Sequence, residues 1–193
     1  MKTPNYTRGQ QLPAILKKRI VILDGAMGTM IQRFKLSEAQ YRGDGYTGPG
    51  SQGERFNDFH KDIKGNNELL SLTRPDVIQD IHEAYLVAGA DLIETNTFGA
   101  TTVAQGDYDM ADLAVEMNLS SARIARAACD KFSTPEKPRF VVGALGPTPK
   151  TASISPDVND PGARNTSFEV LRQAYYEQTE ALVKGGSDVL LVE

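Results

Sequence analysis

The chain has 193 residues, of which 40% are hydrophobic and 24% charged, and this ordinary globular composition excludes a disordered or collagen-like protein. Its 21 basic and 25 acidic residues give a formal charge of −4, which argues against a nucleic-acid-binding surface. Its one cysteine cannot form a disulfide within the chain, residues 1–11 are polar, and no apolar run approaches the roughly 18 residues that span a bilayer. We therefore expect a cytoplasmic protein with one sizeable core.

Four short runs of apolar residues, rich in β-branched side chains, predict the strands of a parallel sheet. Each run is nearly continuous in apolar residues, which indicates that both faces of the strand are covered. The predicted strands are residues 19–24, 91–95, 139–144 and 188–193.

Segments with a helical period separate these strands. A helix is predicted over residues 75–88, because a proline stands at its first position and Gly89 follows its last. A second is predicted over residues 112–132, and a third begins with a capping box at residues 166–169 and runs to Lys184. The alternation of strands and helices predicts an α/β protein, either a (β/α)8 barrel or a doubly wound sheet.

The last predicted strand indicates that the sequence is part of a (β/α)8 barrel. The last predicted strand ends at Glu193 with no helix after it, which would leave a hydrogen-bonding edge open. A complete (β/α)8 barrel has about 250 residues and eight strands. We therefore expect residues 1–18 to form a polar, helical lead-in and residues 19–193 to form the first half of a barrel, truncated at its C-terminus.

Polar residues or glycines stand at the end of every predicted strand, where both fold families bind their ligands. Glycine after a strand permits a tight turn and a close approach of the backbone to a ligand. The candidate binding residues are Asp24 and Gly25, Asn96 and Thr97 within the polar segment at residues 94–99, the Gly-Pro turn at residues 143–148, and Glu193.

Each candidate also has a purely structural interpretation. Asp24 can cap the helix that follows it, Asn96 and Thr97 are common turn residues, and Glu193 can be an acid exposed at the end of a strand. The Gly-Pro segment can be a rigid turn without a ligand. The residues themselves do not decide between these alternatives.

The sequence offers almost no metal ligands or nucleophiles. A zinc site needs three or four Cys, His or carboxylate ligands, but the chain has Cys129, His60 and His82 in dispersed positions. Cys129 is predicted to be a buried thiol inside a helix, and His82 to lie on the solvated side of the helix over residues 75–88. We therefore predict no catalytic and no metal-binding residue in this chain.

Several segments closely resemble the homocysteine-binding domain of cobalamin-dependent methionine synthases. Asp-Gly-x-Met-Gly-Thr and Glu-Thr-Asn-Thr-Phe occur across homocysteine methyltransferases, whereas Thr-Ala-Ser-Ile-Ser-Pro-Asp is more particular to the cobalamin-dependent branch. The glycine-dense loop at residues 43–53 departs from the family pattern by its length. The segments that carry the resemblance are residues 22–30, 64–68, 89–98, 145–148 and 151–161.

The resemblance implies a (β/α)8 TIM barrel of the homocysteine methyltransferase type, which holds zinc on three cysteines. In this family the zinc binds the homocysteine sulfur as a thiolate, because metal coordination lowers the pKa of a thiol. The thiolate takes a methyl group from methylcobalamin, which methyltetrahydrofolate regenerates on a neighbouring domain, and the product is methionine. The resemblance places the zinc ligands in the second half of the barrel, beyond Glu193.

The resemblance therefore implies that these 193 residues bind the amino-acid end of homocysteine, which carries its ammonium group. The resemblance implies that Asp24 and Glu193 hold the substrate ammonium, that Gly25 lets the backbone approach, and that Asn96 and Thr97 form the pocket wall. Two alternatives remain at this point. One is a cobalamin-independent zinc enzyme that uses betaine or S-methylmethionine, and the other is a non-catalytic half-barrel.

Overall fold

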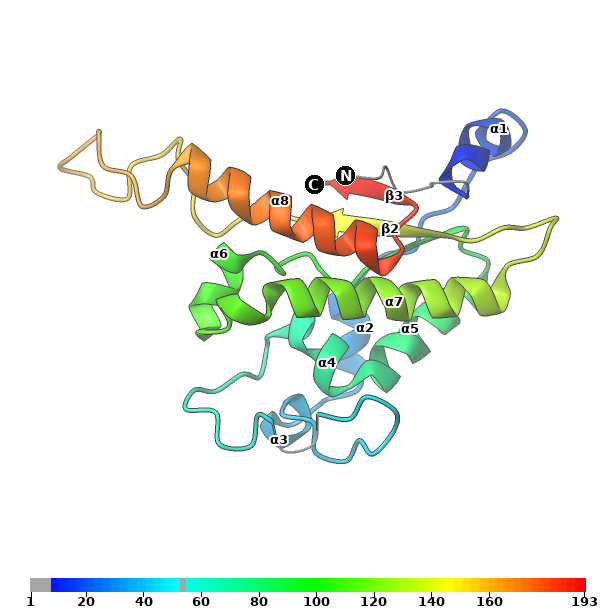
Figure 1. Cartoon of the computed structure of the whole chain (residues 1–193), viewed down its shortest axis with the longest axis horizontal. Helices are drawn as coiled ribbons and strands as arrows, with labels where there is room; N and C mark the ends of the chain where they lie inside the picture. The colour runs from blue at the N-terminus through cyan, green and yellow to red at the C-terminus, as the bar shows by residue number, and fades with distance from the viewer. Residues whose placement is uncertain (1–7, 53–54) are drawn as a thin grey trace.

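The computed structural model describes residues 8–52 and 55–193. Its centre is a parallel sheet of three strands in the order β1-β2-β3, formed by β1 (Leu92–Glu94), β2 (Phe140–Leu145) and β3 (Val189–Val192) (Figure 1). All six residues of β2 are buried, as the predicted covering of both faces requires. The same prediction was wrong for β3, where Leu190 is 41% and Val192 77% exposed. Strands β1 and β3 lie within their predicted ranges, and β2 extends one residue beyond its predicted end at residue 144.

The predicted first strand does not form as a strand. Within residues 19–24 the structure has a single bridge, in which Leu23 pairs in parallel with Leu92 of β1. The neighbouring backbone hydrogen bonds run from Asp91 N to Ile22 O and from Asp24 N to Leu92 O. Ile20 is 84% exposed, so this part of the run gains little from burial, and the segment lies along β1 without a full ladder. The prediction of a strand over residues 19–24 was therefore wrong, and the described sheet has three strands where four were predicted.

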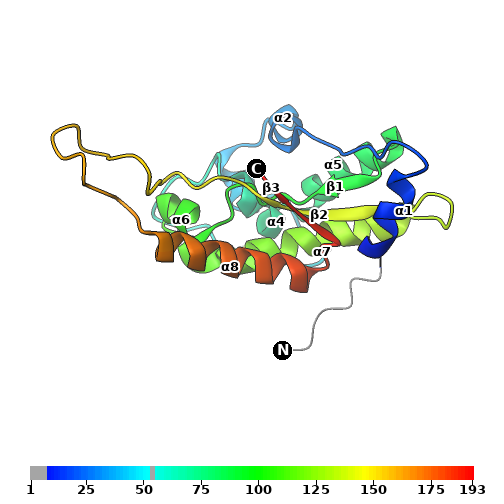
Figure 2. The ribbon, with the colours of Figure 1, turned by 90° about the horizontal axis from the view of Figure 1, so that it is seen from above.

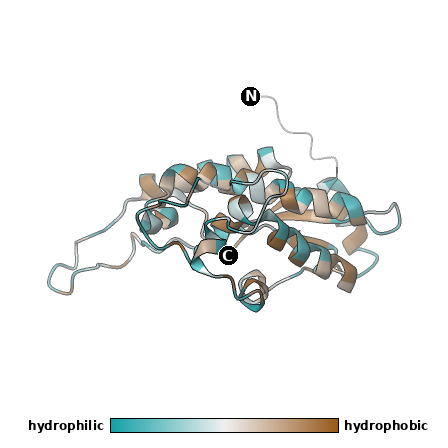
Figure 3. Cartoon of the chain, turned by 90° about the horizontal axis from the view of Figure 1, so that it is seen from below, coloured by the Kyte–Doolittle hydropathy of each residue, from teal (hydrophilic) through white to brown (hydrophobic). Residues whose placement is uncertain are grey.

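Three long helices pack around the sheet. They are α5 (Pro75–Ala88), α7 (Ala114–Phe132) and α8 (Phe168–Gly185), and α7 and α8 lie side by side beneath β2 and β3 (Figures 1 and 2). The long helices carry both hydrophilic and hydrophobic residues, whereas the strands are mostly hydrophobic (Figure 3). No helix within residues 8–52 and 55–193 combines the length and apolar character needed to cross a membrane.

The helix ends follow the predicted signals with two differences. Helix α5 has the predicted bounds, and Gly89 after it adopts a φ of +109°, which favours glycine. Helix α7 begins two residues later than predicted, after a 3-10 turn. The predicted capping box at residues 166–169 was wrong, because Ser167 alone caps α8 by accepting the Val170 N–H.

The remaining helical elements are short and connect the main ones. The glycine-dense loop lies between α3 and the 3-10 turn η2, and Gly53 at its predicted end lies outside the described residues. The short elements are η1 (Gly9–Gln11), α1 (Leu12–Leu16), α2 (Met27–Arg33), α3 (Glu38–Tyr41), η2 (Asn67–Leu69), α4 (Leu70–Thr73), α6 (Thr102–Gln105), η3 (Gly106–Tyr108) and η4 (Ala111–Leu113).

Two aspartates tie β1 to the segment before it and β3 to β2. Asp91 accepts hydrogen bonds from the Ile22 N–H at 3.0 Å and from both terminal nitrogens of Arg19 at 2.8 Å. Directly before β3, Asp188 accepts a hydrogen bond from the Val141 N–H at 2.8 Å and from the Arg126 guanidinium at 2.6 Å. Each aspartate thus satisfies a backbone donor at the start of the neighbouring strand.

Helix α5 buries a histidine that was predicted to be solvated. His82 is fully buried, and neither ring nitrogen has a hydrogen-bond partner in the described structure. The residues one turn away on either side, Ile78 and Leu86, are also buried, so His82 lies on the buried stripe of the helix. Burial lowers the pKa of His82 to about 4. Cys129 is buried in α7, as predicted.

Candidate functional site

A hollow of about 440 Å³ lies at the carboxyl ends of β1, β2 and β3. Four of the five predicted binding residues line it, and the fifth, Asp24, lies next to the lining residue Gly25. The lining residues are Gly25, Ala26, Met27, Gly28, Asn67, Glu68, Glu94, Thr95, Asn96, Thr97, Phe98, Ala144 and Glu193.

Asp24 connects the first segment to the end of β1. Its Oδ1 atom accepts the Glu94 N–H at 2.8 Å. Burial, with a smaller contribution from the charge of Glu94, raises the pKa of Asp24 to about 7. The alternative that Asp24 caps the next helix was wrong, because the N-cap position of α2 belongs to Ala26 and no side chain caps it.

Two further carboxylates line the hollow, Glu94 and Glu68. Burial raises the pKa of Glu94, and the charge of Glu193 raises it further. Glu68 accepts the Gly99 N–H at 2.9 Å, and burial raises its pKa as well. Glu68 was not predicted as a site residue, and Glu94 begins the candidate segment at residues 94–99 but was not named among the binding residues. Both stand in the segments that carry the family resemblance, and the position of Glu94 at the end of a strand was the available signal.

Asn96 and Thr97 use their side chains in internal hydrogen bonds. The Asn96 amide donates to Asn67 O at 2.7 Å and to Ser71 Oγ at 3.3 Å. Thr97 Oγ1 donates to Ala144 O at 2.8 Å and also contacts Thr95 Oγ1 at 2.6 Å. Both residues are buried and line the hollow, so the geometry gives them the role of a rigid wall.

The Gly-Pro turn after β2 brings two backbones into close contact. A Cβ atom on Gly146 would lie 2.4 Å from Phe98 O, so only glycine fits there without a shift of the backbone. The hydroxyl of Tyr175 on α8 donates to Gly146 O at 2.9 Å. The turn therefore fixes the segment after β1 against the segment after β2.

The ionisable side chains that line the hollow are all acidic. Its lining includes three carboxylates, from Glu68, Glu94 and Glu193, and among the described lining residues there is no lysine, arginine or histidine. Partial burial of a carboxylate without a cationic partner is costly, and the raised pKa values of Glu68 and Glu94 reflect this. A ligand with a positively charged group would supply the missing partner.

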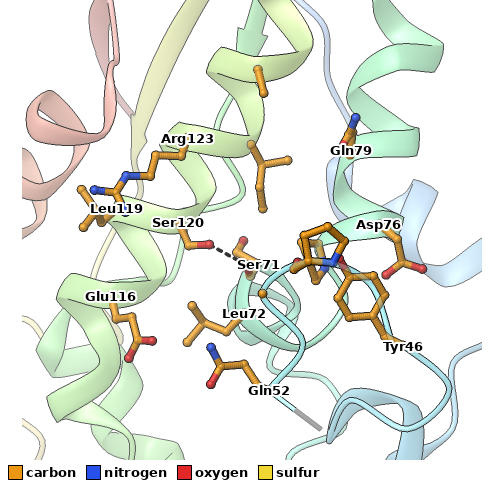
Figure 4. Close-up of a pocket in the computed structure, with 15 residues that line it drawn as sticks. Tyr46, Gln52, Ser71, Leu72, Asp76, Gln79, Glu116, Leu119, Ser120 and Arg123 are labelled. Atoms are coloured by element: carbon orange, nitrogen blue, oxygen red, sulfur yellow. Dashed lines mark hydrogen bonds between the residues drawn. The ribbon is translucent and has the colours of Figure 1, made fainter.

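A second hollow, of about 510 Å³, lies among α4, α5, α7 and the loop that contains Tyr46 (Figure 4). None of the predicted binding residues lines it. Two of its acids are already paired, because Asp76 binds Arg74 and Glu116 binds Arg55. Its wall reaches the first hollow through hydrogen bonds, since Ser120 Oγ donates to Ser71 O at 2.7 Å and Ser71 Oγ accepts from Asn96. Ser71 and Ser120, which line the second hollow, therefore help to hold Asn96 in the wall of the first hollow.

The donor set of this chain does not fit the zinc site that the resemblance implies. Within the described ranges, no group of three or more His, Cys, Asp or Glu side chains is placed to hold a metal ion. The thiol of Cys129 is buried, and His60 lies on the surface beside Asp109. Burial raises the pKa of Cys129 to about 12, which suppresses the thiolate that a zinc ion binds.

We expect the 193-residue chain to retain much less than one zinc ion per molecule, because three thiolate ligands are needed and one inaccessible thiol is present. Metal analysis after dialysis measures this directly.

Cys129 should react with a disulfide reagent at pH 8 only after unfolding in urea, since a pKa of about 12 leaves roughly one thiol in ten thousand ionised. One zinc per chain, or rapid labelling of the folded protein, would contradict the assignment.

The parallel strands and the polar hollow at their carboxyl ends define an α/β protein of the kind that binds ligands at strand ends. The model of the homocysteine S-methyltransferase family matches residues 21–193, and the chain belongs to this family.

Solved structures of one family member share this fold. The metallated form of the homocysteine methyltransferase MmuM from Escherichia coli has a TM-score of 0.65 and 21% identity over 98% of this chain and 57% of that chain. The oxidized form of MmuM has a TM-score of 0.64 and 21% identity over 93% of this chain and 55% of that chain. The chain thus spans a little over half the length of these structures, and at this identity the likeness concerns the fold.

Proposed function

We propose that this chain forms the amino-acid-binding part of the homocysteine site in a cytoplasmic methionine synthase of the cobalamin-dependent type. The observation that carries the proposal is the hollow at the strand ends, which has three carboxylates and, in the described lining, no cationic side chain. The ammonium group of homocysteine is a cation of suitable size. Membership in the homocysteine S-methyltransferase family supports this choice of ligand.

In this proposal Asp24 and Glu193 provide negative charge for the ammonium group. Asp24 Oδ1 accepts the Glu94 N–H, and Asp24 precedes the lining residue Gly25. Gly25 has no atom within 4 Å of the place where a Cβ would stand, which leaves room for a substrate beside the backbone. Asn96 and Thr97 form the rigid wall.

We further propose that residues 1–18 are a lead-in and that residues 19–193 are the first half of a (β/α)8 barrel. The family match, which begins at residue 21, supports the lead-in, and the coverage of 57% of the metallated MmuM structure supports the half-barrel. The zinc ion that activates the homocysteine thiol would then be held by cysteines in the other half of the barrel. The residues of this chain bind and orient the amino acid and take no part in the chemistry at sulfur.

The methyl donor separates the candidate functions. The run at residues 151–157 favours methylcobalamin, recharged by 5-methyltetrahydrofolate on neighbouring domains. Betaine or S-methylmethionine in a cobalamin-independent zinc enzyme is the second candidate, and the MmuM likeness in fold is compatible with it. A non-catalytic half-barrel is the third.

The test uses the polypeptide encoded by the complete reading frame that contains these residues, loaded with zinc and assayed for methionine from homocysteine. Formation of methionine with methylcobalamin or with methyltetrahydrofolate plus cobalamin, and not with betaine or S-methylmethionine, is the expected result. Methionine formed from betaine or S-methylmethionine without cobalamin would establish the second candidate. A protein that neither binds homocysteine nor forms methionine with any donor would overturn the proposal.

A further inference from the structure

Helix α8 binds the backbone of two segments that follow strands of the sheet. The Gln178 side chain donates from Nε2 to Thr97 O, in the loop after β1, at 2.8 Å and across 81 positions of the sequence. One turn earlier on the same face of the helix, the Tyr175 hydroxyl donates to Gly146 O, in the turn after β2, at 2.9 Å. Thr97 lines the hollow, whereas Gln178 and Tyr175 are not among its lining residues. Helix α8 therefore holds a wall of the hollow without lining the hollow itself.

Thr97 is anchored on two elements by different atoms. Its hydroxyl donates to Ala144 O of β2 at 2.8 Å. Its carbonyl oxygen accepts the Gln178 amide of α8 and also the Ala100 N–H at 3.0 Å, which closes a turn over residues 97–100. A residue that is bonded at both its hydroxyl and its carbonyl has little freedom to move. These bonds therefore fix the part of the wall that Thr97 forms.

Packing alone does not explain a glutamine at position 178. Gln178 is 1% exposed, and its Oε1 atom has no hydrogen-bond partner within residues 8–52 and 55–193. A buried polar atom without a partner destabilises the fold, and an apolar side chain of similar length avoids this loss. The other buried residues of α8 are small or apolar, namely Ala174, Ala181, Leu182 and Gly185. The hydrogen bond to Thr97 O is therefore what distinguishes Gln178 from an apolar residue at this position.

Helix α7 provides a second buried amide for the same turn. The Asn118 side chain donates to Ala100 O at 2.7 Å and to Ala114 O of its own helix at 2.7 Å. Its Oδ1 atom, like Oε1 of Gln178, has no partner among the described residues. The turn that runs from Thr97 to Ala100 is thus bound at both ends by amides from different helices. Two incompletely paired amides on one turn indicate that their role is to hold the turn in place.

We propose that Gln178 is a positioning residue for the ligand of the hollow. It fixes the turn over residues 97–100 through the Thr97 carbonyl and makes no contact with the ligand. This inference rests on the proposed function, because homocysteine is the ligand that the hollow is proposed to take. A wall that is ordered before the ligand arrives favours binding, since less conformational freedom is lost on association. Loss of the Gln178 hydrogen bond therefore weakens binding without weakening the fold.

The test replaces Gln178 by methionine, an unbranched apolar side chain of similar length. Thr97 O keeps the Ala100 N–H as a donor, so Gln178→Met leaves no new unpaired carbonyl. Urea unfolding should give a free energy of unfolding equal to or above that of the unaltered chain, because the unpaired Oε1 atom is gone. Calorimetry should show that homocysteine binds about fivefold more weakly, the factor typical of one neutral hydrogen bond.

Two further measurements report on the turn without any ligand. Hydrogen exchange at the Ala100 N–H should become about fivefold faster in Gln178→Met, because the turn opens more often. The NMR signal of the Thr97 carbonyl carbon should shift, since this carbonyl loses one of its two donors. Gln173→Met is the matched control, because Gln173 is an exposed glutamine of α8 that bonds to Glu177. It should change none of the four quantities.

The outcomes separate the inference from the function beneath it. If the unaltered chain does not bind homocysteine, the proposed function fails, and the exchange rate and the carbonyl signal alone decide whether Gln178 fixes the turn. If the unaltered chain binds homocysteine, equal affinity in Gln178→Met overturns the positioning role. A lower free energy of unfolding in Gln178→Met also overturns it, because Gln178 then serves the stability of the fold. Unchanged exchange at Ala100 overturns it in either case.

Discussion

Replacing Asp24 by asparagine is expected to weaken homocysteine binding by about ten- to a hundredfold at pH 8, because a charge-assisted contact contributes roughly 1.5–3 kcal/mol. Asparagine keeps an oxygen that can accept the Glu94 N–H, so the shape of the site should survive. In the empty site the pKa of Asp24 is about 7, whereas a bound ammonium favours the ionised form. Homocysteine affinity should therefore rise as pH increases from 5 to 7 and then level off.

Calorimetric titration at several pH values measures both effects. In Asp24→Asn the homocysteine affinity should increase much less between pH 5 and 7 than in the unaltered chain. Glu193→Gln should also weaken homocysteine binding by about ten- to a hundredfold, but it should keep the increase with pH that the ionisation of Asp24 causes. Glu136→Gln is the control, because Glu136 is an exposed acid before β2, at the opposite end of the strands. Unchanged affinity in both Asp24→Asn and Glu193→Gln would remove these carboxylates from the site.

His82 is expected to make the fold sensitive to mild acid. Its pKa is about 4 in the folded protein and 6.5 when unperturbed, so the unfolded chain binds more protons between these values. The contribution to stability is complete above pH 6.5 and is lost as pH falls toward 4. The difference of about 2.5 units corresponds to roughly 3 kcal/mol in the free energy of unfolding.

Urea unfolding between pH 4 and 7 tests this on three proteins. Relative to the unaltered chain, His82→Leu should lose less stability on acidification by about 3 kcal/mol, because the buried ring that must gain a proton is gone. Removing two unpaired buried nitrogens should also make it at least as stable at pH 7. His60→Gln alters an exposed histidine and should follow the unaltered chain. An equal loss of stability in His82→Leu and the unaltered chain would refute the assignment.

Local sequence signals predicted the elements whose causes are local. The proline at the start of α5 and the glycine after it set the bounds of that helix, because each acts on the backbone within one turn. The unbroken apolar run of β2 predicted a strand covered on both faces, and β2 is buried throughout.

The sequence predicted where the site lies better than it predicted which residues line it. Polar residues at strand ends predicted a hollow there, because parallel strands bring their carboxyl ends to one edge. The hollow does contain Gly25, Asn96, Thr97 and Glu193. Which acids face it depends on register, and a run of apolar residues does not encode the register of its partner. Glu94 was therefore placed in the candidate segment at residues 94–99 but not named as a binding residue. Glu68 was missed because it lies in the 3-10 turn η2, outside the predicted strands.

By itself, then, the sequence determined the α/β class, the bounds of α5, the burial of β2 and Cys129, and the family to which the chain belongs. Only the tertiary structure decided that residues 19–24 pair at a single position, that His82 is buried without a partner, and that Asp24 binds the backbone of Glu94. The physical reason is the range of the interactions. Caps, turns and apolar runs act over a few residues, whereas strand pairing, burial and charge at the site depend on segments about 70 residues apart, as Asp24 and Glu94 are.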